Sequence, residues 1–224
     1  MLTKLGLALA AVAVVATGCS SDSQESLPDG AGLLQEAATA AGGISSAHLA
    51  LKVNGTPPGI NVRSVNGDVN KAGDAKGTLT FDFSGALIEG EFAVVGGTAF
   101  FKGPTGGWQP LSKERAAAIY DSTALLDPQR GIPNLLAKTT EAKTDRREKV
   151  GETKTFKVTG KAAKDTVLPI VPGVRADLEM TYWIAEDSKR PVRIWFQLPD
   201  EAQKPTAEAT LTDFDKPVVV SPPA

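Results

Sequence analysis

Two stretches, Thr78-Leu79-Thr80-Phe81-Asp82-Phe83 and Ile88-Glu89-Gly90-Glu91-Phe92-Ala93-Val94, decide the fold of this 224-residue chain. Apolar and polar side chains alternate along both, which predicts β-strands with one apolar face. Glu89 and Glu91 fall on the opposite face and are expected to meet water. The glycine-rich turns nearby indicate an antiparallel meander. The large apolar residues of this face are Leu79, Phe81, Phe83, Ile88, Phe92 and Val94.

The same period of two recurs before and after these stretches and predicts further strands. They are expected at 48–53, 62–69, 98–102, 148–151, 154–159, 178–184, 192–198 and 207–214. Their apolar positions include Met180, Tyr182, Ile184, Ile194 and Phe196. Composition alone does not distinguish a filled core from a hollow one, so both alternatives stay open here.

Three helices are expected, at 31–41, 112–119 and 131–137, the first ended by the pair Gly42-Gly43. The order is one helix, about five strands, two short helices and about five more strands. Helices grouped beside an antiparallel sheet indicate an α+β domain, and one curved sheet with helices on its concave side fits this order.

The chain begins with a pattern typical of export. Lys4 precedes an apolar run over 5–16, which is too short for a membrane-spanning helix. Ala16-Thr17-Gly18 then leads to the only cysteine, Cys19, and resembles the lipobox of bacterial lipoproteins. We therefore expect a signal peptide over 1–18, a lipid anchor on Cys19 with a polar tether to residue 27, a domain over 28–218 and a tail over 219–224. A secretory signal with an incidental cysteine is the alternative.

Residues with catalytic chemistry are scarce. His48 is the only histidine, and we expect its ring to bond backbone groups at the start of a strand. Zinc sites need several Cys or His ligands, so no metal or other cofactor is expected. Without Lys4 the mature chain has 23 basic and 26 acidic residues, a net charge of −3, which does not favour nucleic-acid binding. The mixed charges of 143–149 indicate a solvated loop or an edge strand.

Several segments together resemble one family, the LppX/LprA/LprF/LprG lipoproteins of mycobacteria and related actinomycetes. The resemblance is strongest to the LprG type and covers nearly all of 28–218. The segments are Ser46-Ala47-His48-Leu49 with Val53-Asn54-Gly55, Gly67-Asp68, residues 88–95, the Trp108 segment, Ile119-Tyr120-Asp121, Leu126-Asp127-Pro128 and Gly131-Ile132-Pro133-Asn134-Leu135-Leu136-Ala137.

This resemblance implies a half-barrel whose helices enclose an apolar cavity for a triacylated glycolipid or triacylglycerol. It places the protein on the outer face of the plasma membrane through its anchor, or in the cell wall or secreted, with a major-facilitator transporter as a partner. It also implies that Leu79 lines the cavity. The expected lining is Leu79, Phe81, Phe83, Ile88, Phe92, Val94, Met180, Tyr182, Ile194 and Phe196.

A carrier needs apolar walls but neither a nucleophile nor a metal, so no enzymatic activity is expected. Two alternatives remain: an envelope scaffold with a filled core, and an esterase acting through a serine and His48. Residues 167–174, broken by two prolines, exclude a regular helix or central strand. With Pro57-Pro58-Gly59-Ile60 they predict either a mobile rim or plain turns.

Overall fold

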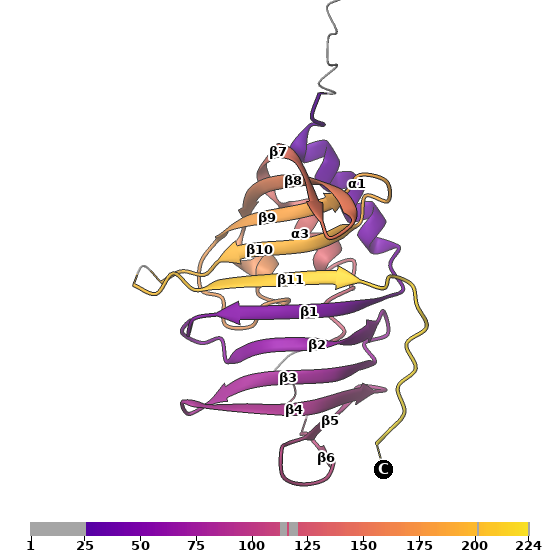
Figure 1. The fold of residues 1–224 in the computed structure, drawn as a ribbon, viewed down its shortest axis with the longest axis vertical. Coiled ribbons are helices and arrows are strands. Elements are labelled where there is room, and N and C mark those ends of the chain that lie inside the picture. Colours follow the sequence, from indigo (N-terminus) through magenta and orange to yellow (C-terminus); the bar gives the residue numbers. More distant parts are fainter. Residues whose placement is uncertain (1–25, 113–115, 117–120, 201, 224) are drawn as a thin grey trace, which may run out of the picture.

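The computed structural model describes residues 26–112, 116, 121–200 and 202–223, which form one antiparallel sheet of eleven strands (Figure 1). The strands are β1 (Ser46–Asn54), β2 (Val62–Asn70), β3 (Ala75–Phe83), β4 (Ala86–Val95), β5 (Thr98–Lys102), β6 (Gln109–Pro110), β7 (Thr140–Val150), β8 (Thr153–Ala162), β9 (Leu178–Ala185), β10 (Pro191–Gln197) and β11 (Thr206–Thr212).

The sheet consists of two meanders joined by the first and last strands. The strand order is β6-β5-β4-β3-β2-β1-β11-β10-β9-β8-β7, so each half of the chain builds one half of the sheet. β1 pairs with β11 from His48↔Thr212 to Asn54↔Thr206. This central pairing makes one continuous sheet, with β6 and β7 as its edges.

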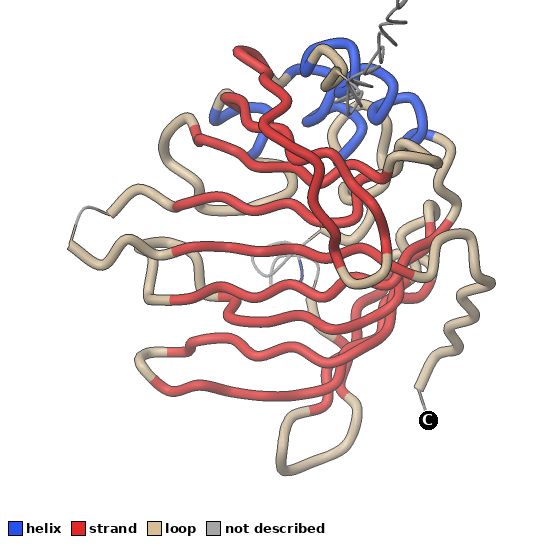
Figure 2. The backbone as a smooth tube through the Cα atoms, turned by 45° about the horizontal axis from the view of Figure 1, so that its top comes forward, coloured by secondary structure: helices blue, strands red, loops and turns tan. Residues whose placement is uncertain are grey.

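The helices are gathered over the β7–β10 half, as the tube view shows (Figure 2). They are α1 (Gly30–Gly42), α3 (Ile132–Lys138) and α4 (Lys164–Val167). Asp29 caps α1 by accepting a hydrogen bond from the Gly32 amide at 2.8 Å. α1 packs on α3 and on β7 through its apolar stripe, Leu33, Leu34, Ala37 and Ala41.

Strand residues alternate between two faces. We call the face that packs against the helices the inner face, and the opposite one the outer face. The main core joins α1 and α3 to inner-face residues such as Leu49, Val158 and Tyr182. A small second cluster of Trp183, Ala185 and Val192 lies on the outer face. The core is therefore concentrated between the helices and one side of the sheet.

The α+β class and the single antiparallel sheet with helices on one face are confirmed. The helices at 31–41 and 131–137 form as predicted, and the charged run over 143–149 belongs to the edge strand β7. The strand predicted at 148–151 was too short, because β7 begins at Thr140. Two register shifts within the β7–β8 pairing break its alternation. The helix predicted at 112–119 falls mostly outside the described residues.

Candidate functional site

The ten residues expected to line a cavity all lie on the inner face. Phe81 pairs with Ile88, and Leu79 pairs with Gly90, so the β3 and β4 positions form neighbouring rows. On the other side of the sheet, Tyr182 pairs with Ile194. Three further pairs place other residues of the set on the same face: Gly77↔Phe92, Ala75↔Val94 and Met180↔Phe196.

The part of this face on β8–β10, which we call the covered half, is tightly packed. Tyr182 is 0% exposed, and Met180, Ile194 and Phe196 are buried as well. α3 reaches this half, since the Thr139 hydroxyl after its last turn lies 2.7 Å from the Tyr182 hydroxyl. Side chains of the protein itself already occupy the space here.

The part on β3–β5, which we call the open half, is only partly covered. Leu79 is buried, but Phe81, Ile88, Phe92 and Val94 are half-buried. Phe83 is 65% exposed. A contiguous patch of partly exposed apolar side chains marks an interaction or ligand-binding surface, whereas single exposed apolar residues are common.

Phe101 on β5 belongs to the open half, although it was not among the ten residues. Its ring meets that of Phe81 edge to face, with centroids 5.7 Å apart. It also covers Gly90, where a Cβ would lie 2.4 Å from the ring. Local sequence does not single it out, because Phe100 and Phe101 are adjacent in the strand expected at 98–102 and alternation alone leaves open which ring faces inward.

A hydrogen-bond pair fixes the end of α3 on the covered half. The Thr139 hydroxyl donates to the Leu135 carbonyl at 2.8 Å and meets the Tyr182 hydroxyl. Burial raises the pKa of the Tyr182 phenol strongly, and the contact with Thr139 offsets only part of this effect. The phenol therefore stays neutral and serves as a structural hydrogen-bonding group.

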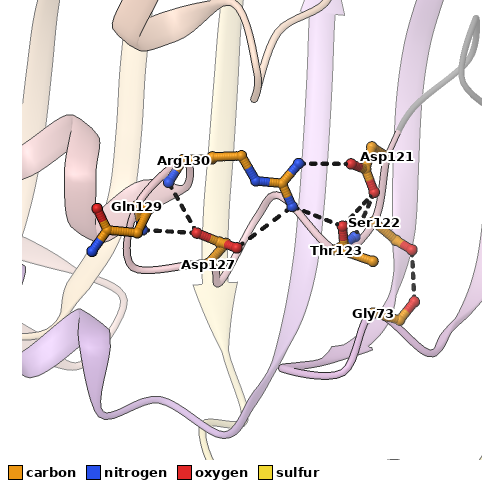
Figure 3. Close-up of polar contacts among 7 residues, drawn as sticks. All are labelled: Gly73, Asp121, Ser122, Thr123, Asp127, Gln129 and Arg130. Atoms are coloured by element: carbon orange, nitrogen blue, oxygen red, sulfur yellow. Dashed lines mark hydrogen bonds and ion pairs between the residues drawn. The ribbon is translucent and has the colours of Figure 1, made fainter.

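The segment 121–131 carries a polar network that connects the helix layer to the open half (Figure 3). The Arg130 guanidinium donates to Asp121 at 3.2 Å and contacts Asp127 at 3.5 Å. The Ser122 hydroxyl donates to the Gly73 carbonyl at 2.6 Å, in the turn between β2 and β3. This network ties the segment before α3 to the β2–β3 turn.

Both acids of the network are held in the ionised form. At Asp121, partial burial opposes ionisation, but hydrogen bonds from Thr123 and Arg130 outweigh it and lower the pKa. At Asp127, the amide of Gln129 is the main cause of the lowered pKa, with Arg130 adding to it.

Gly131 follows the network and admits no larger residue. A Cβ at this position would lie 2.2 Å from the Ala124 carbonyl oxygen and 2.3 Å from that of Leu125. The close approach lets the Ile132 amide donate to the Leu125 carbonyl at 2.9 Å. The Asp127-Pro128 and Gly131-Ile132-Pro133 segments thus have a structural role, the turn that starts α3.

Among the described residues, two grooves are lined mainly by the outer face. One of about 870 Å³ lies over β1–β3 and β11, among polar residues that include Ser64, Asn66 and Thr80. The other, of about 570 Å³, lies between β1–β4 and the C-terminal tail, where the Lys76 ammonium donates to the Val219 carbonyl at 3.0 Å. Neither groove is the enclosed apolar cavity expected from the sequence, which stays a prediction.

His48 differs from its expected role. Its Nδ1 lies 2.7 Å from the Asp68 carboxylate on the neighbouring strand, so the ring pairs with a side chain and not with the backbone. The register that places the two residues opposite one another, His48↔Asp68, explains the contact. Among the described residues, no serine hydroxyl hydrogen-bonds the ring, so the contacts of an esterase triad are not assembled in this part of the chain.

The two segments predicted as a rim touch each other. A Cβ on Gly173 would lie 2.1 Å from the Gly59 carbonyl oxygen, and both glycines have positive φ. Residues 167–174 contain only the end of α4 and turns, as the two prolines predicted. Their mobility stays a prediction.

Cys19 lies outside the described residues. None of the described helices has the length and apolar character needed to cross a bilayer. In the same part of the chain, no group of three or more His, Cys, Asp or Glu residues is arranged to hold a metal ion.

Comparison with known proteins gives consistent matches. The LppX_LprAFG lipoprotein family model matches residues 29–220. The lipoarabinomannan carrier protein LprG of Mycolicibacterium smegmatis is 36% identical over 225 residues, covering 96% of this chain and 93% of the relative. LprG of Mycobacterium leprae is 32% identical over 220 residues, covering 95% and 91%.

Solved structures share the fold. The crystal structure of LprF from Mycobacterium bovis superposes with a TM-score of 0.78 at 24% identity, covering 87% of this chain and 97% of LprF. That of LppX from Mycobacterium tuberculosis gives a TM-score of 0.64 at 23% identity, covering 85% and 97%. The sheet and its helix layer therefore recur in both proteins.

Proposed function

The chain belongs to the LppX_LprAFG lipoprotein family, and on that premise we propose that it is a membrane-anchored lipid carrier. Its ligand would be a triacylated glycolipid or an acylglycerol, taken up on the inner face and moved toward the outer cell envelope. Relatives at 31–36% identity are named lipoarabinomannan carriers, which supports a ligand with both acyl chains and a glycan.

The observation that carries the proposal is the open half of the inner face. Phe81, Phe92 and Phe101 lie side by side on three strands and remain half-buried. Acyl chains laid on these rings would remove their remaining apolar surface from water, which is favourable at about 25 cal/mol per Å².

The energetics of transfer explain why a carrier is needed. Moving an acyl chain of about 16 carbons from hydrocarbon into water costs a free energy on the order of 12 kcal/mol, at about 0.8 kcal/mol per methylene. Three chains together would make free diffusion negligible. An apolar protein surface that receives the acyl chains lowers this barrier, and the open half offers such a surface.

We propose Leu79 as the floor of this binding surface. It is buried between Val65 on β2 and Gly90 on β4, and the Phe101 ring lies over Gly90. A bulkier residue at position 79 would push into the space beside Phe81 and Phe101. Its substitution is therefore expected to change ligand capacity without changing the outer face.

Signal cleavage before Cys19 and acylation of its sulfur remain part of the proposal. Two or more acyl chains hold a protein stably at a membrane, whereas one gives marginal binding. Anchoring would keep the domain on the outer face of the plasma membrane, beside the donor lipids. A major-facilitator transporter is the proposed partner in export.

Native mass spectrometry of the full-length protein, extracted from membranes of an actinobacterial host, tests the proposal. We expect a fraction of the protein to carry one triacylated lipid, released on collisional activation. If the protein is lipid-free in every preparation, the carrier function is refuted. A stoichiometric envelope protein that covers the open half would instead support the scaffold alternative.

A further inference from the structure

The turns at one end of the strands carry apolar side chains that contact water. Five large apolar residues of the described chain are exposed, and three of them belong to this end. Phe83 and Leu87, at 65% and 66% exposed, flank the β3–β4 turn, and Leu168, at 42%, follows α4. We call the surface formed by residues 55–61, 83–87 and 163–177 the loop end.

The loop end is one contiguous surface. The segment 55–61 connects its parts, because the Gly59 carbonyl contacts Gly173 and the Asp82 amide donates to the Asn61 carbonyl at 2.8 Å. The Thr56 hydroxyl donates to Gln203 at 2.7 Å, which adds the loop before β11. The exposed side chains are therefore held on neighbouring, mutually braced turns.

The opposite end of the strands has a different character. Its turns, at 71–74, 96–97, 151–152 and 186–190, expose small or polar residues such as Ala72, Glu152 and Ser188. Within the described part of these turns, no large apolar side chain is exposed. The two ends of the same strands therefore differ in surface character, because large apolar side chains are exposed at the loop end and small or polar ones at the opposite end.

The chain leading to Cys19 leaves the domain at the β7 edge of the sheet, close to the loop-end termini of β7 and β8. Gly30, the first residue of α1, packs against Ala142 so closely that a Cβ would lie 2.7 Å from its carbonyl. Ala142 in turn lies beside Gly160. The residues paired with Gly160 on successive strands are Met180, Phe196, Ala207 and Val53. Val53 is one residue from the end of β1 at the loop end, so Gly160 lies at the same position along the strands.

We propose that the loop end is the membrane-docking surface of the protein, with Phe83, Leu87 and Leu168 inserted into the lipid interface. This inference rests on the proposed lipid-carrier function and on the anchor at Cys19. Six residues, 20–25, separate Cys19 from Ser26, the first described residue, and the seven Cα-to-Cα steps span at most about 25 Å. A tether of that length, starting at the β7 edge of the loop end, is long enough to reach a bilayer on which that end docks.

Docking in this way joins the membrane to the binding surface. Phe83 lies on the inner face in the same row of β3 as Phe81 and Leu79, and it pairs with Ala86 across the turn. An acyl chain leaving the bilayer beside Phe83 could move along this row without crossing water. The open half then faces its lipid source at the loop end.

Charge contributes little to the proposed docking. The charged groups of the loop end balance one another. Arg63 pairs with Asp82 at 3.2 Å, Lys164 lies 3.7 Å from Asp165, and the exposed Arg175 is offset in charge by Asp177, whose carboxylate accepts from the Lys164 amide at 2.8 Å. Insertion should therefore occur with phosphatidylcholine alone and change little when phosphatidylglycerol or salt is added.

Site-specific labelling of the full-length acylated protein tests the inference. Acylation occupies the Cys19 sulfur, and Cys19 is the only cysteine, so an introduced cysteine takes a single label. Ser84→Cys and Asp165→Cys place a nitrobenzoxadiazole label at the loop end, and Glu152→Cys places it at the opposite end. In phosphatidylcholine vesicles containing a nitroxide-labelled lipid, we expect blue-shifted, quenched emission at 84 and 165 and aqueous emission at 152.

Matched substitutions separate insertion from mere proximity. The double variant Phe83→Gln/Leu87→Gln should lower the ratio of docked to undocked protein at the 165 label by about tenfold or more per side chain. Val219→Gln removes a side chain that is 72% exposed but lies in the tail, and it should leave the ratio unchanged.

The outcomes distinguish this inference from the proposed function, since bound glycolipid is measured in the same preparations. Aqueous emission at 84 and 165 with glycolipid retained overturns the docking surface and leaves the carrier function standing. Quenched labels without any glycolipid support docking and refute the carrier function. Quenching at 152 equal to that at 84 also overturns the inference, as does a double variant that docks like the unsubstituted protein.

Discussion

The covered and open halves of the inner face have the same sequence pattern and opposite environments. Phe196 on β10 and Phe83 on β3 both occupy apolar positions of alternating strands, yet Phe196 is buried and Phe83 is largely exposed. The difference comes from what lies above each half, since α1 and α3 pack over β7–β10. Alternation selects the face of a strand, whereas tertiary contacts decide whether that face is filled.

This contrast assigns a role to each half. The covered half holds the fold together, and we propose that the open half holds the ligand. A substitution in the first should change stability, and a substitution in the second should change lipid capacity. The following experiments test that division, beginning with the largest expected effect.

Matched phenylalanine truncations give the largest contrast in stability. Phe196→Ala should lower the free energy of unfolding by about 3–5 kcal/mol, because it leaves a cavity in a packed core. Phe83→Ala should lower it by less than about 1 kcal/mol, because the ring is mostly in water already. Urea denaturation of lipid-free protein followed by circular dichroism measures both. Equal losses would remove the distinction between the halves.

Leu79→Trp should lower the fraction of lipid-loaded protein at least severalfold while the domain stays folded. The larger ring adds volume at the floor of the open half, with a stability cost of about 1–3 kcal/mol. Native mass spectrometry measures the loaded fraction.

Thr80→Trp is the matched control for Leu79→Trp, since Thr80 is the next residue on β3 and points to the outer face. It should leave lipid loading unchanged. Loading that survives Leu79→Trp, or is lost equally in both variants, would place the ligand elsewhere.

Tyr182→Phe should cost about 1 kcal/mol of stability and leave lipid loading unchanged. It removes one hydrogen bond in the covered half, while the Thr139 hydroxyl keeps its bond to the Leu135 carbonyl. Thermal unfolding with parallel lipid analysis measures both effects. A large drop in lipid loading would show that the covered half also contacts ligand.

Acidification should weaken the network of Asp121, Asp127 and Arg130, with the smallest effect of the series. Both acids have a pKa below their ordinary value of 3.8 in the folded state. Their contribution is therefore fully present above about pH 4 and is lost as the pH falls through the lowered values. Arg130→Met should lose less stability between pH 5 and pH 3 than the unsubstituted protein. An identical pH profile would show that Arg130 contributes nothing to the two lowered pKa values.

Much of the fold could be predicted because the strands alternate cleanly. The positions of 78–83 and 88–94 fixed both the strands and the inner face, and Gly131-Ile132-Pro133 marked α3. β7 was underestimated because its register shifts and its run of charges hide the alternation. Such a strand is defined by its partner β8, which local sequence does not show.

The proposed site could be predicted less completely than the fold. The ten inner-face residues could be found from alternation, but their division into two halves depends on which strands the helices cover. Phe101 was missed because the Phe81–Phe101 contact requires β5 to pair back on β4. The His48–Asp68 pair likewise depends on the β1–β2 register.

Photochemical crosslinking tests the division of the inner face most directly. A triacylglycerol with a diazirine in one acyl chain would be loaded into the full-length protein, irradiated, and its crosslinks mapped by peptide mass spectrometry. We predict crosslinks in peptides of β3–β5, residues 75–102, and none at the inner-face positions of β8–β10. Crosslinks concentrated on β8–β10 or on the outer grooves, or no crosslinks at all, would contradict the open half as the lipid-binding surface.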